Sequence, residues 1–238
     1  MKTAIVDSRI SEKMNRRLAL EGFQVMKLPP SSALPEAIAS HPDSLIFKLG
    51  NTILTTADYC EEASYVFSDL RELYPEIKIS VSADELGGRY PEDARLNALV
   101  IGNNLFCNRG NISEGVLRIA EDRGLSVINV KQGYPACSVL TLRDSAAITS
   151  DEGLCKTFSK YGIRVYKIRK GAISLPPYEY GFIGGACGVF EDKIYFLGNY
   201  KAHPSAHIIE EAAREMSYTP ISLSDEELVD LGGILFIT

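Results

Sequence analysis

Hydrophobic and polar positions follow one recurring order along this chain. A short apolar or alternating run, a polar turn and a second run predict a hairpin, and an amphipathic segment of helical period and a third run follow. The turns Gly50-Asn51 and Gly102-Asn103 supply the positive φ that tight hairpins need. The predicted unit is strand, strand, helix, strand, and it occurs at 44–81, 98–130, 138–168 and 188–223.

The two ends of the chain complete a fifth unit. Residues 1–7 predict a strand, a helix follows from an N-cap at Ser11 to a stop at Gly22, and residues 23–28 predict another strand. The tail, 233–238, is a further strand. Because an unpaired strand is an open edge, we expect the tail to pair with residues 1–7 and so to close a ring.

These elements predict an α/β fold of five strand–strand–helix–strand blades around a central axis, a five-bladed αβ-propeller, in a single domain over 1–238. The blades are expected at about 1–30 with 230–238, 43–82, 96–131, 136–170 and 184–224. An ordinary open α/β sheet is the alternative. The short-turn hairpins favour the ring, because they place antiparallel pairs before each helix.

Composition narrows the function classes. The chain has 238 residues and a formal net charge of −6, which argues against nucleic acid as a partner. No apolar run approaches the roughly 18 residues of a membrane span, and no signal peptide is visible. Five cysteines without a CxxC pair indicate a reduced, cytoplasmic protein without a disulfide framework, a zinc site or another cofactor. Such a chain could also form a homodimer.

The segments that lead into the inner strands carry most of the candidate chemistry. In a ring of blades these segments crowd the axis, where ligands bind. Carboxylates occur in four of the five, which suits a cationic small molecule, and glycines in three allow close backbone approach. The segments are 41–44, 92–97, 133–138, 178–187 and 230–233.

Two stretches resemble a known family. Pro42-Asp43-Ser44-Leu45-Ile46-Phe47 with Thr52-Ile53-Leu54-Thr55-Thr56 is similar to the first-blade segment of the penteins. These guanidine-modifying enzymes include arginine deiminases, amidinotransferases and dimethylarginine dimethylaminohydrolases. Val229-Asp230 with Gly232-Gly233 resembles their C-terminal segment. The resemblance implies the pentein fold over nearly the whole chain, most like an uncharacterised bacterial family of that fold, and a guanidinium-binding role for Asp43.

The chain departs from these enzymes at the decisive positions. Their nucleophilic Cys follows the tail glycines, but residues 234–236 contain no Cys. Their catalytic His is expected within 134–138, which contains no His. Their second acid is expected near 96–97, where Asp93 or the amide of Asn97 is the nearest equivalent. The familiar reaction therefore does not transfer with the fold.

Three residues are candidates for catalysis. The thiolate of Cys137 or Cys187 could attack an amidine carbon if a neighbour lowers its pKa, although both are also small residues suited to packing. His41 could act as a base or lie on the surface. His203 and His207 have the spacing of metal ligands, but no third ligand matches them, so no metal site is expected.

Five polar residues are candidates for binding the substrate. Asp43 could hold a guanidinium or an amine by charge-assisted hydrogen bonds, or could cap a turn. Asp93 and Asp230 hold similar positions before inner strands, and Asn97 could orient a ligand or satisfy a strand end. Glu179 lies between two tyrosines and would suit a cation if its loop acts as a lid rather than as plain surface.

Two functions remain open. The first is a hydrolase or transferase of a guanidino or amidino compound that uses Cys137 or Cys187 in place of the family's usual thiol. The second is a non-catalytic module that binds a small molecule or a protein, since penteins also include a ribosomal-subunit anti-association factor. The missing tail Cys favours binding. Asp43 favours a small cationic guanidino or amidino partner in the central cavity.

Overall fold

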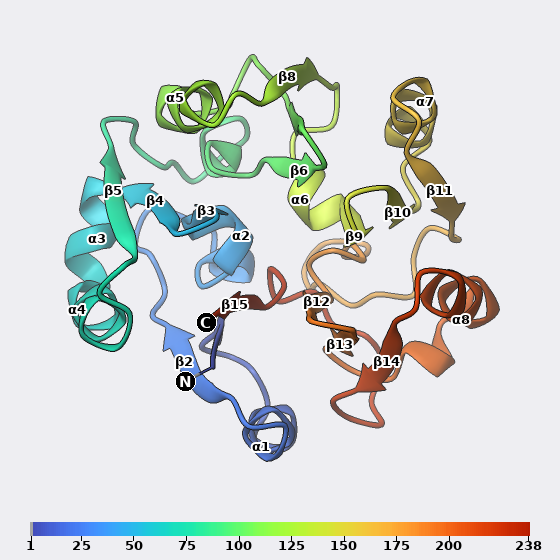
Figure 1. Ribbon diagram of the computed structural model, residues 1–238. Coiled ribbons are helices and arrows are strands. Elements are labelled where there is room, and N and C mark those ends of the chain that lie inside the picture. Colours follow the sequence, from blue (N-terminus) through green and yellow to red (C-terminus); the bar gives the residue numbers. More distant parts are fainter. Residues whose placement is uncertain (1) are drawn as a thin grey trace.

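The computed structural model describes residues 2–238, and these form a ring of five three-stranded sheets (Figure 1). From the axis outwards the strands are β15 (Leu235–Ile237), β1 (Thr3–Asp7) and β2 (Gln24–Leu28); β3 (Phe47–Leu49), β4 (Thr52–Thr56) and β5 (Lys78–Ser82); β6 (Leu99–Ile101), β7 (Asn104–Cys107) and β8 (Ser126–Asn129); β9 (Val139–Leu142), β10 (Ala146–Thr149) and β11 (Arg164–Lys167); and β12 (Cys187–Phe190), β13 (Lys193–Phe196) and β14 (Thr219–Ser222). Among the described residues, no helix is both long and apolar enough to cross a membrane.

Every sheet pairs its strands in the same way. The inner strand runs antiparallel to the middle strand, as where Phe47 faces Leu54, and the middle strand runs parallel to the outer one, as where Thr52 faces Lys78. A parallel pair needs a crossover connection, which a helix on the outside of the ring supplies (Figure 1). These helices are α1 (Glu12–Leu20), α3 (Ala57–Glu62) with α4 (Ser64–Leu73), α5 (Glu114–Asp122), α7 (Glu152–Lys160) and α8 (Ala206–Glu215). The predicted α/β propeller is confirmed.

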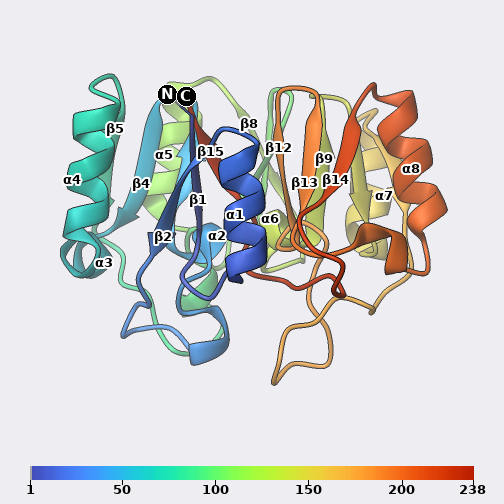
Figure 2. The same ribbon diagram turned by 90° about the horizontal axis from the view of Figure 1, so that it is seen from below.

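The first and last strands close the ring. β15 pairs antiparallel with β1, with Thr3 opposite Ile237. Phe236 adds an aromatic contact to the closure, because its ring centroid lies 4.8 Å from that of Phe23. Both ends of the chain lie side by side at one face of the ring (Figure 2). The predicted pairing is confirmed for residues 3–5, while Met1 lies outside the described residues.

Short helices precede two of the inner strands and take the place of their predicted starts. The expected strands at 44–49 and 138–142 are preceded by, and partly replaced by, the short helices α2 (Pro42–Leu45) and α6 (Pro135–Ser138). Proline stands at the first position of each helix, where its fixed φ and its missing N–H are favourable. Both helices lie close to the axis (Figure 1). They therefore present candidate site residues to the centre of the ring. Short 3₁₀ turns complete the elements: η1 (Glu36–Ile38), η2 (Glu92–Ala94) and η3 (Tyr200–Ala202).

Candidate functional site

A cavity of about 350 Å³ lies where the segments before the inner strands converge. Four of the five segments singled out by the sequence contribute side chains to its lining. The lining residues are Ile38, His41, Ser44, Tyr134, Cys137, Leu175, Tyr178, Glu179, Tyr180, Phe182 and Asp230. The fifth segment, 92–97, contacts this lining from behind, through Asn97 and Asp93.

The Cys137 thiol is hydrogen-bonded on two sides. Its Sγ donates to Oδ2 of Asp43 at 2.5 Å and accepts from Nδ2 of Asn97 at 3.3 Å. The same Nδ2 donates to the carbonyl of Asp43 at 3.2 Å, and Oδ1 of Asn97 accepts from the backbone N–H of Ala136 at 2.8 Å. Asn97 therefore ties α6 to α2 and fixes the contact between the thiol and the carboxyl group.

Asp230 is the buried carboxyl group of the cavity lining, with 1% of its surface exposed. It accepts hydrogen bonds from the backbone N–H of Phe182 at 2.8 Å and of Gly232 at 3.0 Å. A Cβ atom at Gly181 or Gly185 would clash with its side chain. These two glycines therefore leave the space in which the Asp230 carboxyl group sits.

His41 lies between two carboxyl groups. Its Nδ1 is 3.8 Å from Oδ1 of Asp230 and its Nε2 is 3.8 Å from Oδ2 of Asp7. Asp7 in turn accepts from Nη2 of Arg9 at 2.6 Å. Neither ring nitrogen of His41 has a hydrogen-bond partner among the described residues, although the side chain is 1% exposed. Within residues 2–238, no group of three or more His, Cys, Asp or Glu side chains is arranged to hold a metal ion.

Burial sets the protonation of these groups. It raises the pKa of Asp43 to about 6, and together with the charge of Asp43 it raises the pKa of Asp230 to about 7. Burial and the same two carboxylates raise the pKa of the Cys137 thiol well above its usual range. Burial lowers the pKa of His41 to about 4. At neutral pH the site therefore holds a protonated thiol, a neutral imidazole, a largely ionised Asp43 and an Asp230 that is about half ionised, and a bound cation would favour full ionisation of both carboxyl groups.

Of the other predicted site residues, two lie at or beside the central cavity and one lies away from it. Asp93 accepts from the hydroxyl group of Tyr134 at 2.8 Å and so supports a lining ring, and Glu179 lines the cavity from an exposed loop. Cys187 lies apart, because its Sγ donates to the carbonyl of Ile183 at 3.1 Å inside a hydrophobic cluster. All the predicted site residues except Cys187 are therefore gathered at or directly behind the cavity wall.

Sequence reasoning missed Asp7, Arg9 and the apolar wall formed by Ile38, Leu175 and Phe182. Asp7 ends β1 and carries an Asp-Ser-Arg pattern typical of a turn, which gave no indication of a site. Its contact with His41 depends on how neighbouring segments are brought together at the axis. No local pattern encodes that contact.

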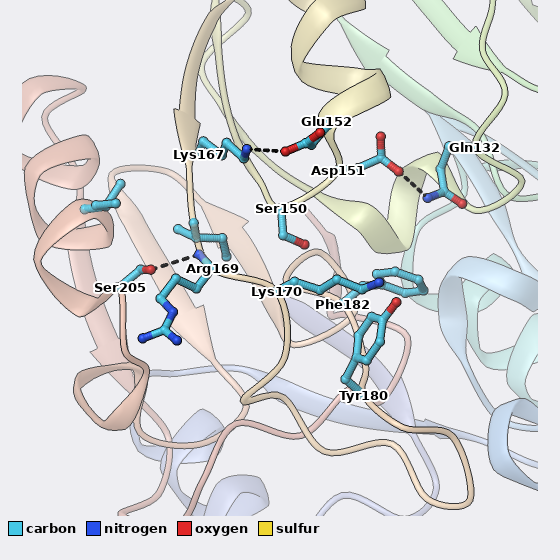
Figure 3. Close-up of a pocket in the computed structure, with 12 residues that line it drawn as sticks. Gln132, Ser150, Asp151, Glu152, Lys167, Arg169, Lys170, Tyr180, Phe182 and Ser205 are labelled. Carbon is cyan, nitrogen blue, oxygen red and sulfur yellow. Dashed lines mark hydrogen bonds and ion pairs between the residues drawn. The ribbon is translucent and has the colours of Figure 1, made fainter.

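Tyr180 and Phe182 also line a second, larger groove of about 710 Å³ (Figure 3). Its charged groups are largely basic or already paired: Lys167 contacts Glu152 at 2.6 Å, and Nζ of Lys170 lies 4.7 Å from the centroid of the Tyr180 ring. None of the described residues lining this groove is a Cys or a His. The central cavity is therefore the better candidate for covalent chemistry.

Solved structures of guanidine-modifying enzymes share this architecture. Dimethylarginine dimethylaminohydrolase, in an adduct with 4-chloro-2-hydroxymethylpyridine, superposes with a TM-score of 0.59 at 14% identity, over 94% of this chain and 92% of that one. A variant of the Pseudomonas aeruginosa enzyme complexed with citrulline superposes with a TM-score of 0.58 at 13% identity, over 94% of this chain and 91% of that one. Inosamine-phosphate amidinotransferase from Streptomyces griseus superposes with a TM-score of 0.55 at 12% identity, over 94% of this chain and 78% of that one. At these identities the likeness shows the fold, which is the pentein fold.

Sequence comparison gives the family. No curated protein matches the chain. One family model matches residues 5–235, from β1 to the first residue of β15, and so spans all five blades and every residue of the cavity lining. The chain therefore belongs to the family of unknown function DUF6873.

Proposed function

We propose that this protein binds a small guanidino or amidino cation in the central cavity and acts on it as a hydrolase or transferase through Cys137. One observation carries the proposal. The Cys137 thiol is hydrogen-bonded to Asp43 and shares its cavity with the buried Asp230, while no described lining residue is a Lys or an Arg. A planar cation with several N–H groups matches such a set of acceptors. A protein of the same fold has been solved with citrulline bound.

A bound cation would lower the pKa of the Cys137 thiol. In the free protein, burial and two carboxylates disfavour the thiolate. A guanidinium group beside Asp43 and Asp230 favours the ionised form of every neighbouring acid, including the thiol. Asp43 then takes the thiol proton along the existing hydrogen bond. The sulfur lone pair forms a bond to the central carbon of the ligand, while the C=N electron pair moves onto nitrogen and neutralises the cation.

The remaining steps return the proton. The leaving amine departs with the proton that Asp43 accepted, and Cys137 is left carrying an S-linked amidino cation. Attack by water on that carbon is followed by cleavage of the C–S bond, which returns the electron pair to sulfur and releases a urea, and this completes a hydrolase cycle. Attack by a second amine followed by the same C–S cleavage releases a new guanidinium compound and completes a transferase cycle. His41 is neutral and has no hydrogen-bond partner among residues 2–238, so it is the group available to accept a proton from the attacking water or amine.

A second function is favoured by the state of the thiol. The raised pKa of Cys137 means that the free protein holds a thiol rather than a thiolate. A binding module needs no nucleophile, and the same cavity then serves only to hold the cation. The two functions share the ligand class and differ in whether a bond to sulfur forms.

The test uses methylguanidine as the probe, with calorimetry for binding and mass spectrometry for an adduct on Cys137. Binding with release of methylamine or ammonia supports the enzyme, and binding with neither adduct nor release supports the module. Cys137→Ser is expected to bind the probe but to form no adduct, whereas the matched Cys187→Ser variant behaves as the parent protein. Absence of binding to the parent protein overturns both functions.

A further inference from the structure

The central cavity has a carboxyl group at each end. Asp230, which is 1% exposed, lies in the interior beside His41. Glu179 is exposed and lies on the loop at the cavity mouth. The other described lining residues are uncharged, since the imidazole of His41 is neutral at pH 7. Of the described lining residues, none is a Lys or an Arg.

Two basic side chains contact groups next to the cavity without belonging to its described lining. The Arg9 guanidinium group is bound to Asp7 at 2.6 Å. Lys170 lines the neighbouring groove, where its Nζ lies 4.7 Å from the centroid of the Tyr180 ring (Figure 3). An anionic group on a ligand would therefore meet no cation among the described lining residues, and it would face carboxylates instead.

The walls suit an alkyl chain that ends in a cation. Tyr134, Tyr178 and Tyr180 contribute aromatic rings, and Leu175 and Phe182 complete an apolar surface. Aromatic faces attract ammonium groups as well as methylene groups. A volume of about 350 Å³ is at the small end of ligand cavities and suits a short, slender molecule.

We propose that the ligand is a dication: its guanidinium or amidinium group lies beside Cys137, and a short alkyl chain leads to an amine held at the mouth by Glu179 and the tyrosine rings. This inference rests on the proposed function and adds the chemistry of the far end of the ligand. A guanidino compound with an α-carboxylate is disfavoured by charge, because its carboxylate would lie near Glu179 with no cation among the described lining residues to pair with.

Three probes that share one guanidinium group test the far end. They are 4-aminobutylguanidine, butylguanidine and arginine, titrated calorimetrically into the full chain at one pH and ionic strength. We expect 4-aminobutylguanidine to bind about threefold or more tighter than butylguanidine, because its amine adds an ion pair with Glu179 near solvent. Arginine is expected to bind weakest of the three. Glu179→Gln is expected to lower the affinity for 4-aminobutylguanidine about threefold and to leave that for butylguanidine unchanged. The Glu179→Gln variant is expected to fold as the parent protein does, because Glu179 is exposed.

The outcomes separate the two proposals. If no probe binds, the proposed function fails. If butylguanidine binds but arginine binds as tightly as 4-aminobutylguanidine, or if Glu179→Gln changes nothing, the site holds a guanidinium group and the inference about its far end is overturned. Lys170→Gln is the matched control on the groove side of Tyr180, and it is expected to leave the order of the three affinities unchanged. Loss of arginine binding in this variant would identify Lys170 as a carboxylate receptor and would also overturn the inference.

Discussion

The Sγ atom of Cys137 donates a hydrogen bond to Oδ2 of Asp43 at 2.5 Å, across 94 residues of sequence and between the short helices α6 and α2. Reactive cysteines usually lie beside a cation or at the N-terminus of a long helix, which lowers the thiol pKa. Here the partner is an acid, and burial with two carboxylates raises that pKa. The free protein therefore keeps Cys137 protonated, and its reactivity depends on the charge of what enters the cavity.

Asp43→Asn is expected to change the alkylation of Cys137 in opposite directions with two reagents. The neutral reagent iodoacetamide should react faster, because the carboxylate that raises the thiol pKa is gone. The gain is about threefold for each unit by which that pKa falls, after allowing for the weaker nucleophilicity of a less basic thiolate. The cationic reagent 2-chloroacetamidine should react more slowly, because it loses an anionic partner. Mass spectrometry of the Cys137 peptide measures both rates.

The opposite signs make this result specific. A loosened fold would expose Cys137 and speed both reagents, so equal acceleration would contradict the proposed electrostatic role of Asp43. Cys155 is half-buried on the outer helix α7 and serves as the internal control in the same digest. Its two rates are expected to be unchanged by the substitution.

Asp43→Asn is also expected to stabilise the free protein at pH 8. The carboxyl pKa is 3.8 without the fold and about 6 within it, so the folded chain binds more protons between these values. The free energy of unfolding then falls as the pH rises from about 4 to about 6 and remains low above that. The variant escapes this loss, which is roughly 1–3 kcal/mol at pH 8, and its amide oxygen can still accept from Cys137. Urea unfolding at pH 5 and pH 8 measures the difference.

Asp225→Asn is the control for that measurement. Asp225 is an exposed carboxylate whose pKa is lowered by its hydrogen bond to Lys13, so its contribution is already complete at pH 5. Its removal should have the same small effect at both pH values. An equal effect of Asp43→Asn on the free energy of unfolding at both pH values would show that burial does not raise the pKa of the Asp43 carboxyl group.

The fold could be predicted because each blade repeats its own pattern. Hairpin turns such as Gly50-Asn51 and Gly102-Asn103 lie between segments with strand character. Ser113 and Asp151 each accept a hydrogen bond from a backbone N–H in the first turn of the helix that follows. Both signals are local, so the repeat can be predicted without tertiary information. The helices α2 and α6 could not be predicted. Four residues show no helical period, and their proline starts are equally typical of a turn.

The candidate site could be predicted in part for the same reason. Placing the segments before the inner strands at the axis brings Asp43, Asn97, Cys137 and Asp230 together without further information. Cys187 shows where this reasoning fails. Successive side chains on a strand point to opposite faces, so a shift of one residue determines whether a side chain faces the axis or the core. Cys187 faces the core.

Gly232→Ala is expected to disrupt the site, whereas Gly162→Ala is not. The two glycines have nearly equal φ values, +69° and +71°. A Cβ at Gly232 would clash with His41, whereas a Cβ at Gly162 would have no described atom within 4 Å apart from its own chain neighbours. Gly162→Ala should cost about 1 kcal/mol, the price of left-handed backbone alone. Gly232→Ala should cost about 1–3 kcal/mol more, because the His41 side chain must move, and it should weaken methylguanidine binding. Urea unfolding and calorimetry measure the two effects, and equal stability losses would contradict the close approach of Gly232 to His41.

Ligand binding is expected to weaken as the pH falls from 8 to 5. Burial holds the pKa of Asp43 at about 6 and that of Asp230 at about 7 in the free protein, and a bound cation lowers both. Below these pKa values the carboxyl groups must release protons before the cation binds, so the affinity for methylguanidine should fall up to about tenfold per pH unit for each proton released. His41 titrates at about 4, below this window, and does not contribute. Calorimetry in buffers of different ionisation enthalpy counts the protons directly. Asp43→Asn should make the slope shallower by removing one of the two titrating groups, and an affinity that is flat between pH 5 and pH 8 would show that the cation does not bind beside this pair.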